Sequence, residues 1–314
     1  MKYFIFIVIA LIPLSLNAQK PDFLTSIDCT IAQNERYGDN KENVFDIFLP
    51  KTNKPTALII FIHGGGFING DKDECYKWRK EDITYFLKNN IAFATINYRF
   101  FNSNDSVGVK KCIADIKTAL QYIRFHAKKY NINKELIGCY GISAGAGSSL
   151  YLAFHDDLAI KNDTTLLGES TRIKCAGAIA TQATYDVFRW LKFIPNLRLV
   201  VNLKKKQFYN FIANFYGYPD YKSFEPNRTK LIQQLDMLEM ITPDDPPIYV
   251  MNLQKERFPK NYGIIEHHRG HAIILDETLK KQHVEHEVFI YSKTIKTEND
   301  IHSPLKEFMV NHLK

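Results

Sequence analysis

Short apolar runs alternate with amphipathic stretches along most of this chain. The runs at 58–62, 91–98, 135–140, 176–181 and 246–252 have the length of strands buried on both faces. Longer polar and amphipathic stretches separate them. Strands that alternate with helices at this spacing predict an α/β fold with a mostly parallel central sheet flanked by crossover helices.

The clearest predicted helix spans 110–129, because its apolar residues recur every three or four positions along one stripe. Further helices are predicted at 78–89, 271–283 and 305–313, with a last strand at 284–291. The alternating run 44–49, ended by Pro50, predicts an edge strand. The buried stripe of the long helix consists of Cys112, Ile113, Ile116, Ala119, Leu120, Ile123 and Ala127.

The segment from about 185 to 240 interrupts this alternation. It is rich in aromatic residues and shows no strand pattern, so it predicts a helical insertion that covers a site as a lid. The alternative is a set of surface helices whose aromatic side chains enter the main core.

The N-terminus has the pattern of a secretory signal. Lys2 precedes an apolar stretch at 3–16, and cleavage is expected after Ala18. The alternative is a membrane anchor, but about fourteen apolar residues are short for a span. We therefore expect a signal peptide at 1–18, an exported protein that is periplasmic or secreted, no stable membrane anchor after cleavage, and a single domain at 19–314.

Composition and charge narrow the function only slightly. The 314 residues are 45% hydrophobic and 24% charged, as is ordinary for a globular protein. The formal charge of +7 is dispersed apart from 204–206, and no basic motif interleaved with aromatic residues predicts nucleic-acid binding. Of the five cysteines, Cys29 and Cys75 stand in loop-like, polar surroundings and are candidates for one disulfide in an oxidising compartment.

Two motifs carry the candidate chemistry. Ser143 lies in Gly-Ile-Ser-Ala-Gly between a predicted strand and a predicted helix, which would raise its hydroxyl above the sheet edge as a nucleophile. His-Gly-Gly-Gly at 63–66 ends another strand, and bare glycines let backbone N–H groups approach a ligand closely. A nucleophile and fixed amide donors are the two halves of acyl-transfer chemistry.

On these motifs the chain resembles the α/β-hydrolase esterases, in particular the hormone-sensitive-lipase-like branch and its bacterial feruloyl/acetyl-esterase and formamidase relatives. The resemblance runs from about Tyr37 to the C-terminus, with a divergent middle third. It implies an oxyanion hole formed by the backbone N–H groups of Gly65, Gly66 and Ala144. It implies a small-molecule ester as substrate and no cofactor.

The base and the acid of the expected triad are less clearly marked. In the hydrolase order the histidine follows the last strand, and His302 occupies that place. Aligned with the resemblance, Glu256 falls where the family usually has Asp, although its neighbours do not look like the family's loop. Glu266, Asp300 and the complete absence of an acid remain alternatives.

His267 and His271 have the i, i+4 spacing of a zinc-binding helix. The glutamate that would follow the first histidine is replaced by His268, so we expect a solvated or capping role and no metal. The sequence thus predicts a serine hydrolase of carboxylic esters. Its alternatives are a non-catalytic binding protein with a degenerate triad, and an amidase or formamidase that uses the same site.

Overall fold

The computed structural model describes residues 20–102 and 105–314. The predicted signal peptide lies outside the described residues. Within the described part of the chain, no helix has both the length and the apolar character needed to cross a bilayer.

The centre of the molecule is an eight-stranded sheet with the spatial order β1-β2-β4-β3-β5-β6-β7-β8. The sheet is antiparallel where β2 meets β1 and β4, and parallel from β4 through β8. The mostly parallel sheet predicted from the sequence is therefore confirmed. The strands are β1 Cys29–Arg36, β2 Val44–Pro50, β3 Thr56–Ile62, β4 Ala92–Ile96, β5 Ile132–Ile142, β6 Ala176–Ile179, β7 Ile248–Asn252 and β8 His286–Ile290.

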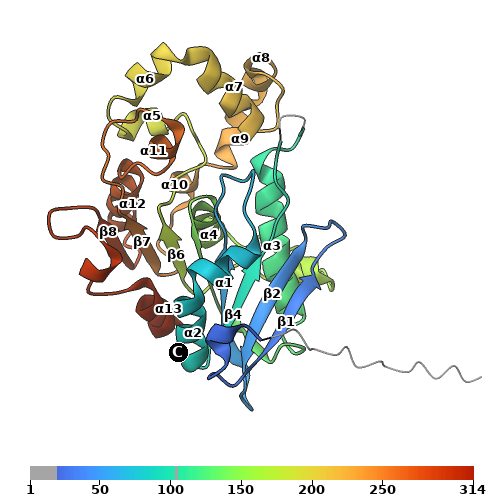
Figure 1. Ribbon diagram of the computed structural model, residues 1–314. Coiled ribbons are helices and arrows are strands. Elements are labelled where there is room, and N and C mark those ends of the chain that lie inside the picture. The colour runs from blue at the N-terminus through green and yellow to red at the C-terminus, as the bar shows by residue number, and fades with distance from the viewer. Residues whose placement is uncertain (1–19, 103–104) are drawn as a thin grey trace, which may run out of the picture.

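Helices cover both faces of this sheet (Figure 1). Residues of α2 and α13 pack in the buried cluster on one face, and residues of α3, α4 and α12 pack in the cluster on the other. The α-helices are α1 Cys75–Trp78, α2 Lys80–Lys88, α3 Val109–Phe125, α4 Ala144–Phe154, α5 Trp190–Phe193, α6 Leu197–Leu203, α7 Lys205–Phe215, α8 Tyr221–Phe224, α9 Arg228–Gln233, α10 Met237–Met240, α11 Tyr262–Glu266, α12 Gly270–Lys281 and α13 Leu305–Leu313. The 3₁₀ turns are η1 Asp22–Leu24, η2 Lys72–Glu74, η3 Leu166–Gly168, η4 Glu225–Asn227 and η5 Glu298–Asp300.

The predicted long helix corresponds to α3, and every residue of its predicted apolar stripe is buried. The helix predicted at 78–89 is broken at Arg79 into α1 and α2. The break leaves Trp78 with 67% of its surface exposed.

The expectation that 44–49 forms an edge strand is wrong. β2 lies inside the sheet, because the unpredicted strand β1 pairs along its outer side. The polar residue of this strand, Asp46, is buried and pairs with the buried Lys72 at 3.0 Å.

The segment 185–240 contains α5 to α10 and no strand, which confirms the prediction that it is helical. In Figure 1 these helices lie above one end of the sheet. Phe211 and Phe215 of α7 and Trp190 of α5 line a cavity with Ser143, so aromatic residues of the segment do reach the predicted site.

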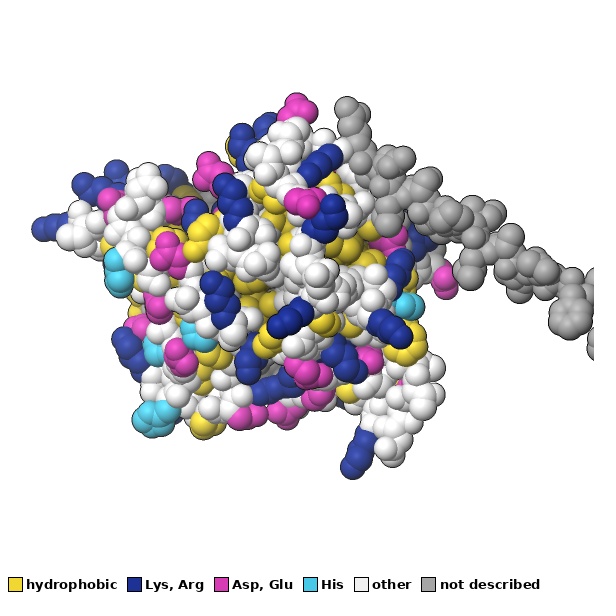
Figure 2. Space-filling model, turned by 90° about the horizontal axis from the view of Figure 1, so that it is seen from below, with side chains coloured by type: hydrophobic (Ala, Val, Ile, Leu, Met, Phe, Trp, Pro, Cys, Tyr) yellow, Lys and Arg dark blue, Asp and Glu magenta, His cyan; other side chains and the backbone are white. Residues whose placement is uncertain are grey.

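The expected disulfide is absent. Cys29 opens β1 and Cys75 opens α1; both are buried, and all five cysteines are free thiols. Their polar sequence neighbours did not reveal that the cysteines themselves face the core. On the face opposite the 185–240 segment, basic and acidic side chains are interspersed (Figure 2), as expected for a dispersed net charge.

Candidate active site

Ser143 stands at the turn between β5 and α4 with φ 55° and ψ −118°, a backbone conformation that costs a non-glycine residue free energy. The flanking glycines serve a different purpose. A Cβ on Gly145 would lie 2.0 Å from the Ile62 carbonyl oxygen, and one on Gly141 would lie 2.4 Å from the backbone of Gly145. The strain therefore falls on the serine, and the glycines allow β3, β5 and α4 to pack closely.

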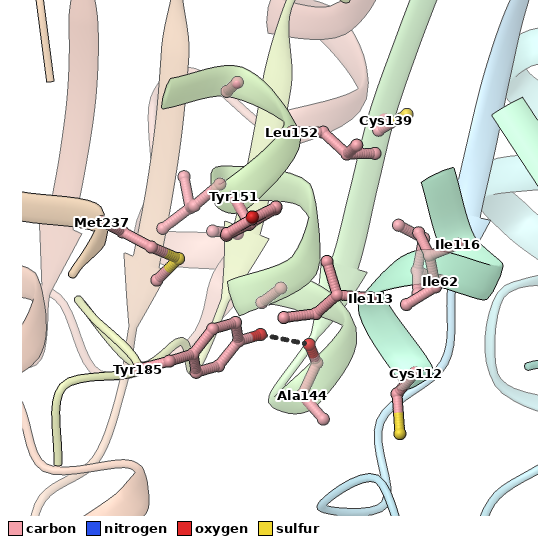
Figure 3. Packing of buried hydrophobic residues seen from close by; sticks show 14 of the residues in the cluster. Ile62, Cys112, Ile113, Ile116, Cys139, Ala144, Tyr151, Leu152, Tyr185 and Met237 are labelled. Carbon is pink, nitrogen blue, oxygen red and sulfur yellow. Dashed lines mark hydrogen bonds between the residues drawn. The ribbon is translucent and has the colours of Figure 1, made fainter. Parts of the chain in front are cut away.

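The turn is held in place by the helix that follows it. α4 is buried along its whole length. The Tyr185 hydroxyl donates a hydrogen bond to the Ala144 carbonyl at 3.1 Å, and Figure 3 shows the ring reaching the first turn of α4. A buried helix with a side chain anchored at its first turn fixes the position of the Ser143 hydroxyl.

The glycine run forms a loop beside Ser143. Gly65 and Gly66 have φ 98° and 61°, values that favour glycine. Tyr98 supports the loop, because its hydroxyl donates to the carbonyl oxygens of His63 at 2.9 Å and Gly64 at 3.2 Å. The buried His63 ring stacks on Tyr98 with 4.4 Å between ring centroids, so the histidine of this motif is structural.

The amide donors predicted for the oxyanion hole lie close to the nucleophile. Gly66 and Ala144 line the same cavity as Ser143, and Gly65 lines the adjoining groove. Within residues 20–102 and 105–314, none of these three N–H groups has a backbone hydrogen-bond acceptor. They are therefore available to a substrate oxygen, and their role as an oxyanion hole stays a prediction.

The imidazole that contacts Ser143 belongs to His267. Its Nε2 lies 2.7 Å from the Ser143 Oγ. The predicted base, His302, is exposed and packs its ring against Phe289. The structure thus replaces His302 by His267 as the partner of Ser143, because the chain returns to the nucleophile after β7 rather than after β8.

His267 follows directly on α11, and Asn252 at the end of β7 helps to hold it. The Asn252 side-chain amide donates to the His267 carbonyl at 3.1 Å. Burial lowers the pKa of His267 below its ordinary value, and the nearby Gly263 carbonyl opposes this shift by favouring the protonated form. The ring is therefore neutral at pH 7, which is the state a general base requires.

No carboxylate partner supports His267 in the part of the chain that the structure describes. Glu256, the predicted acid, is bound by Lys260 at 2.9 Å and accepts the N–H groups of Arg257 and Phe258; these bonds lower its pKa to about 2. Asp300 accepts backbone N–H groups next to η5. Neither contacts an imidazole, so the structure does not bring Glu256 into a triad.

Among the residues that line the cavity with Ser143, Glu266 carries a carboxyl group. It lines both the cavity and the groove at Ser143, yet it forms no hydrogen bond or ion pair through its carboxyl group with any described residue. Burial alone raises its pKa to about 7. Glu266 is therefore a cavity residue and does not orient His267.

The other two histidines of this stretch are structural. His271 is buried, accepts the Ala183 N–H at 3.2 Å and donates to the Ile265 carbonyl at 3.0 Å. His268 accepts the Gly270 N–H at 3.0 Å, which is a local capping bond. Like His271, His268 is buried. A solvated role is thus wrong for both. Among the described residues, no group of three or more His, Cys, Asp or Glu side chains is placed to hold a metal ion.

Two spaces meet at Ser143. One is a small cavity whose far walls are mostly aromatic or aliphatic and come from 185–215. The other is a wide groove that passes the glycine loop and His267 and reaches Trp78 and Arg79. The site therefore offers a confined apolar space on one side of the nucleophile and an open channel on the other.

A family model named BD-FAE matches residues 45–258. The chain belongs to the BD-FAE family. This membership makes it a carboxylesterase-like α/β-hydrolase and confirms the resemblance found in its two motifs.

Solved structures with the same fold include esterases. A truncated carbohydrate esterase from gut microbiota has a TM-score of 0.59 at 17% identity and covers 90% of this chain and 96% of its own. The bifunctional GH43-CE protein of Bacteroides eggerthii has a TM-score of 0.62 at 18% identity over 90% of this chain and 38% of its own. Esterase B from Lactobacillus rhamnosis gives 0.57 at 15% identity over 84% and 76%. At these identities the likeness establishes the α/β-hydrolase fold.

A relative by sequence is a probable isoprenylcysteine alpha-carbonyl methylesterase of Arabidopsis thaliana. It is 28% identical over 111 residues, which are 35% of this chain. The match spans only 22% of the relative's length. This match therefore does not establish the activity or the substrate of this BD-FAE member.

Proposed function

We propose that this BD-FAE protein hydrolyses carboxylic esters through an acyl-enzyme on Ser143, with His267 as the general base. The observation that carries the proposal is the 2.7 Å contact between Ser143 Oγ and His267 Nε2 beside unpaired amide donors. Nucleophile and base within hydrogen-bond reach are the geometric signature of an activated serine.

The reaction follows from this arrangement. His267 Nε2 takes the hydroxyl proton as Oγ attacks the ester carbonyl, and the carbonyl oxygen becomes an oxyanion facing the N–H groups of Gly65, Gly66 and Ala144. Collapse breaks the bond to the alcohol oxygen, which receives the proton from the imidazolium. A water molecule then attacks the acyl-enzyme by the same steps and releases the carboxylic acid.

The base works without a carboxylate partner in this proposal. In a triad the carboxylate orients the imidazole and stabilises its charged form, and its loss typically costs about ten-thousandfold in rate. Here Asn252 and the Gly263 carbonyl hold the histidine segment and ring instead. We therefore expect a slower esterase than one with a complete triad.

The small cavity points to short acyl groups. Its apolar walls suit an acetyl or similarly short chain, whereas a larger alcohol fits the open groove. The names of the structural relatives, which include a carbohydrate esterase, support acetylated polyols as the first substrates to test.

The test is hydrolysis of 4-nitrophenyl acetate by the purified protein and its Ser143→Ala variant. We expect release of nitrophenol that the variant loses. Equal rates for the two proteins would end the esterase proposal.

The missing carboxylate also favours a second candidate, a non-catalytic protein that binds its ligand at Ser143. If this candidate is correct, a substrate ester binds to the wild-type protein and to Ser143→Ala, and neither protein cleaves it. An amidase or formamidase that uses the same residues would instead cleave an anilide or formamide faster than the matched ester.

Export also remains a proposal and rests on the signal pattern at 1–18. Mass spectrometry of the N-terminal peptide of the mature protein tests it. A chain beginning near residue 19 supports export, and an intact N-terminus contradicts cleavage.

A further inference from the structure

Glu266 is the last residue of α11 and occupies a special position in the site. It lines both the small cavity and the wide groove, so it stands where the two meet at Ser143. An ester attacked by Ser143 must place its acyl group on one side of this junction and its alcohol on the other. Glu266 therefore lines the space on both sides of the bond that is broken.

The carboxyl group has no partner of its own among the described residues. The contrast with Glu256, ten positions earlier, is clear, because that carboxylate is bound by a lysine and two backbone N–H groups. A polar group taken out of water without a hydrogen-bond partner destabilises the folded protein. A carboxyl group kept unpaired in a substrate cavity is therefore available to a ligand.

We propose that Glu266 binds a hydroxyl group on the alcohol part of the ester, at the carbon next to the one that carries the ester oxygen. The preferred substrates are thus short-chain esters of alcohols that carry a second hydroxyl group on that neighbouring carbon. This inference rests on the proposed function and adds the feature by which the same site selects its substrate.

A hydroxyl group fits Glu266 better than a cation does. Because burial raises the pKa of Glu266 to about 7, both its protonated and its ionised forms are present near neutral pH. A hydroxyl group donates to the carboxylate and accepts from the acid, whereas an ammonium group pairs only with the ionised form.

The test compares two acetates of nearly equal size, 2-hydroxyethyl acetate and 2-methoxyethyl acetate. They differ in the donor that Glu266 would bind. We expect the wild-type protein to show a kcat/KM for the hydroxy ester about tenfold higher than for the methoxy ester, the size of one hydrogen bond to a charged group.

Three variants test whether Glu266 causes the preference for the hydroxy ester. Glu266→Leu should bring the ratio of the two kcat/KM values close to one, and Glu266→Gln, whose amide still accepts and donates, should retain part of it. Glu256→Leu is the matched control and should keep the wild-type ratio, because Glu256 is 39% exposed at its side chain and pairs with Lys260. Thermal unfolding confirms that each variant is folded.

The outcomes separate this inference from the function on which it rests. A wild-type ratio near one, or a ratio that Glu266→Leu leaves unchanged, overturns the role of Glu266 while ester hydrolysis stands. If wild-type protein cleaves neither acetate nor 4-nitrophenyl acetate, the proposed function itself fails and the inference fails with it.

Discussion

Replacing His267 by alanine removes the imidazole that lies 2.7 Å from the nucleophile. A positioned general base typically contributes about a hundredfold to ten-thousandfold. We expect a loss near the middle of that range, about a thousandfold in kcat or about 4 kcal/mol of activation free energy, because no carboxylate among the described residues contacts the ring to strengthen the base.

The assay is steady-state hydrolysis of 4-nitrophenyl acetate with thermal unfolding as a check on folding. Because the base acts only in the transition state, kcat and kcat/KM should fall together while KM changes little. The matched control is His302→Ala. His302 is exposed and touches Phe289, so its removal should change the rate by less than about twofold. The opposite result, a large loss in His302→Ala and near-normal activity in His267→Ala, would refute the geometric assignment.

Three further outcomes follow from the structure. Glu256→Gln should retain wild-type esterase activity, because the Glu256 carboxylate pairs with Lys260 and not with a histidine. A loss of activity of a hundredfold or more, about the effect of a catalytic group, would show that Glu256 is the acid after all. The pH dependence of kcat/KM is measured in Glu266→Gln, because the neighbouring carboxyl group no longer titrates in that variant. We expect kcat/KM to fall in acid with a midpoint below the ordinary histidine pKa of about 6.5, because burial lowers the pKa of His267 and only the neutral ring is active. A midpoint above that value would indicate a carboxylate partner of His267. Gly145→Ala should lower the free energy of unfolding in urea by about 3 kcal/mol or more, because its Cβ would lie 2.0 Å from the Ile62 carbonyl oxygen. The control Gly263→Ala should not destabilise the protein, because the nearest atom to its Cβ would be 3.8 Å away. Equal effects of the two substitutions would contradict close packing at Gly145.

The parts of the site carried by continuous segments could be predicted from the sequence. The nucleophile turn and the glycine loop each follow a buried strand, and β3 and β5 are neighbours in the sheet, so the two motifs meet at the same edge. The alternation of apolar runs and amphipathic stretches likewise sufficed for the parallel part of the sheet. In both cases the pattern lies within a few consecutive residues.

The base could not be predicted in this way. His267 lies 124 residues after Ser143 and stands in a polar stretch whose helix, α11, has only five residues and no clear amphipathic pattern. The topological rule that the histidine follows the last strand selected His302 instead. One signal was present, because the adjacent histidines at 267 and 268 lie between the predicted strand at 246–252 and the predicted helix at 271–283.

The edge of the sheet was misjudged for a related reason. Asp46 alternates with apolar neighbours as a solvent-facing residue does, but in the fold it pairs with Lys72 in the interior. A buried ion pair joins residues of two separate segments, and a pattern within one segment cannot reveal it. The same limit applied to Cys29 and Cys75, whose burial depends on packing against other elements.

Covalent labelling of Ser143 by a fluorophosphonate, followed by peptide mass spectrometry, is the direct test of whether Ser143 and His267 form the reacting pair. We expect an adduct on Ser143 in the wild-type protein, none in Ser143→Ala, much slower labelling in His267→Ala and an unchanged rate in His302→Ala. An unlabelled wild-type serine, or labelling that is as fast without His267 as with it, would contradict the claim that these two residues form the reacting pair.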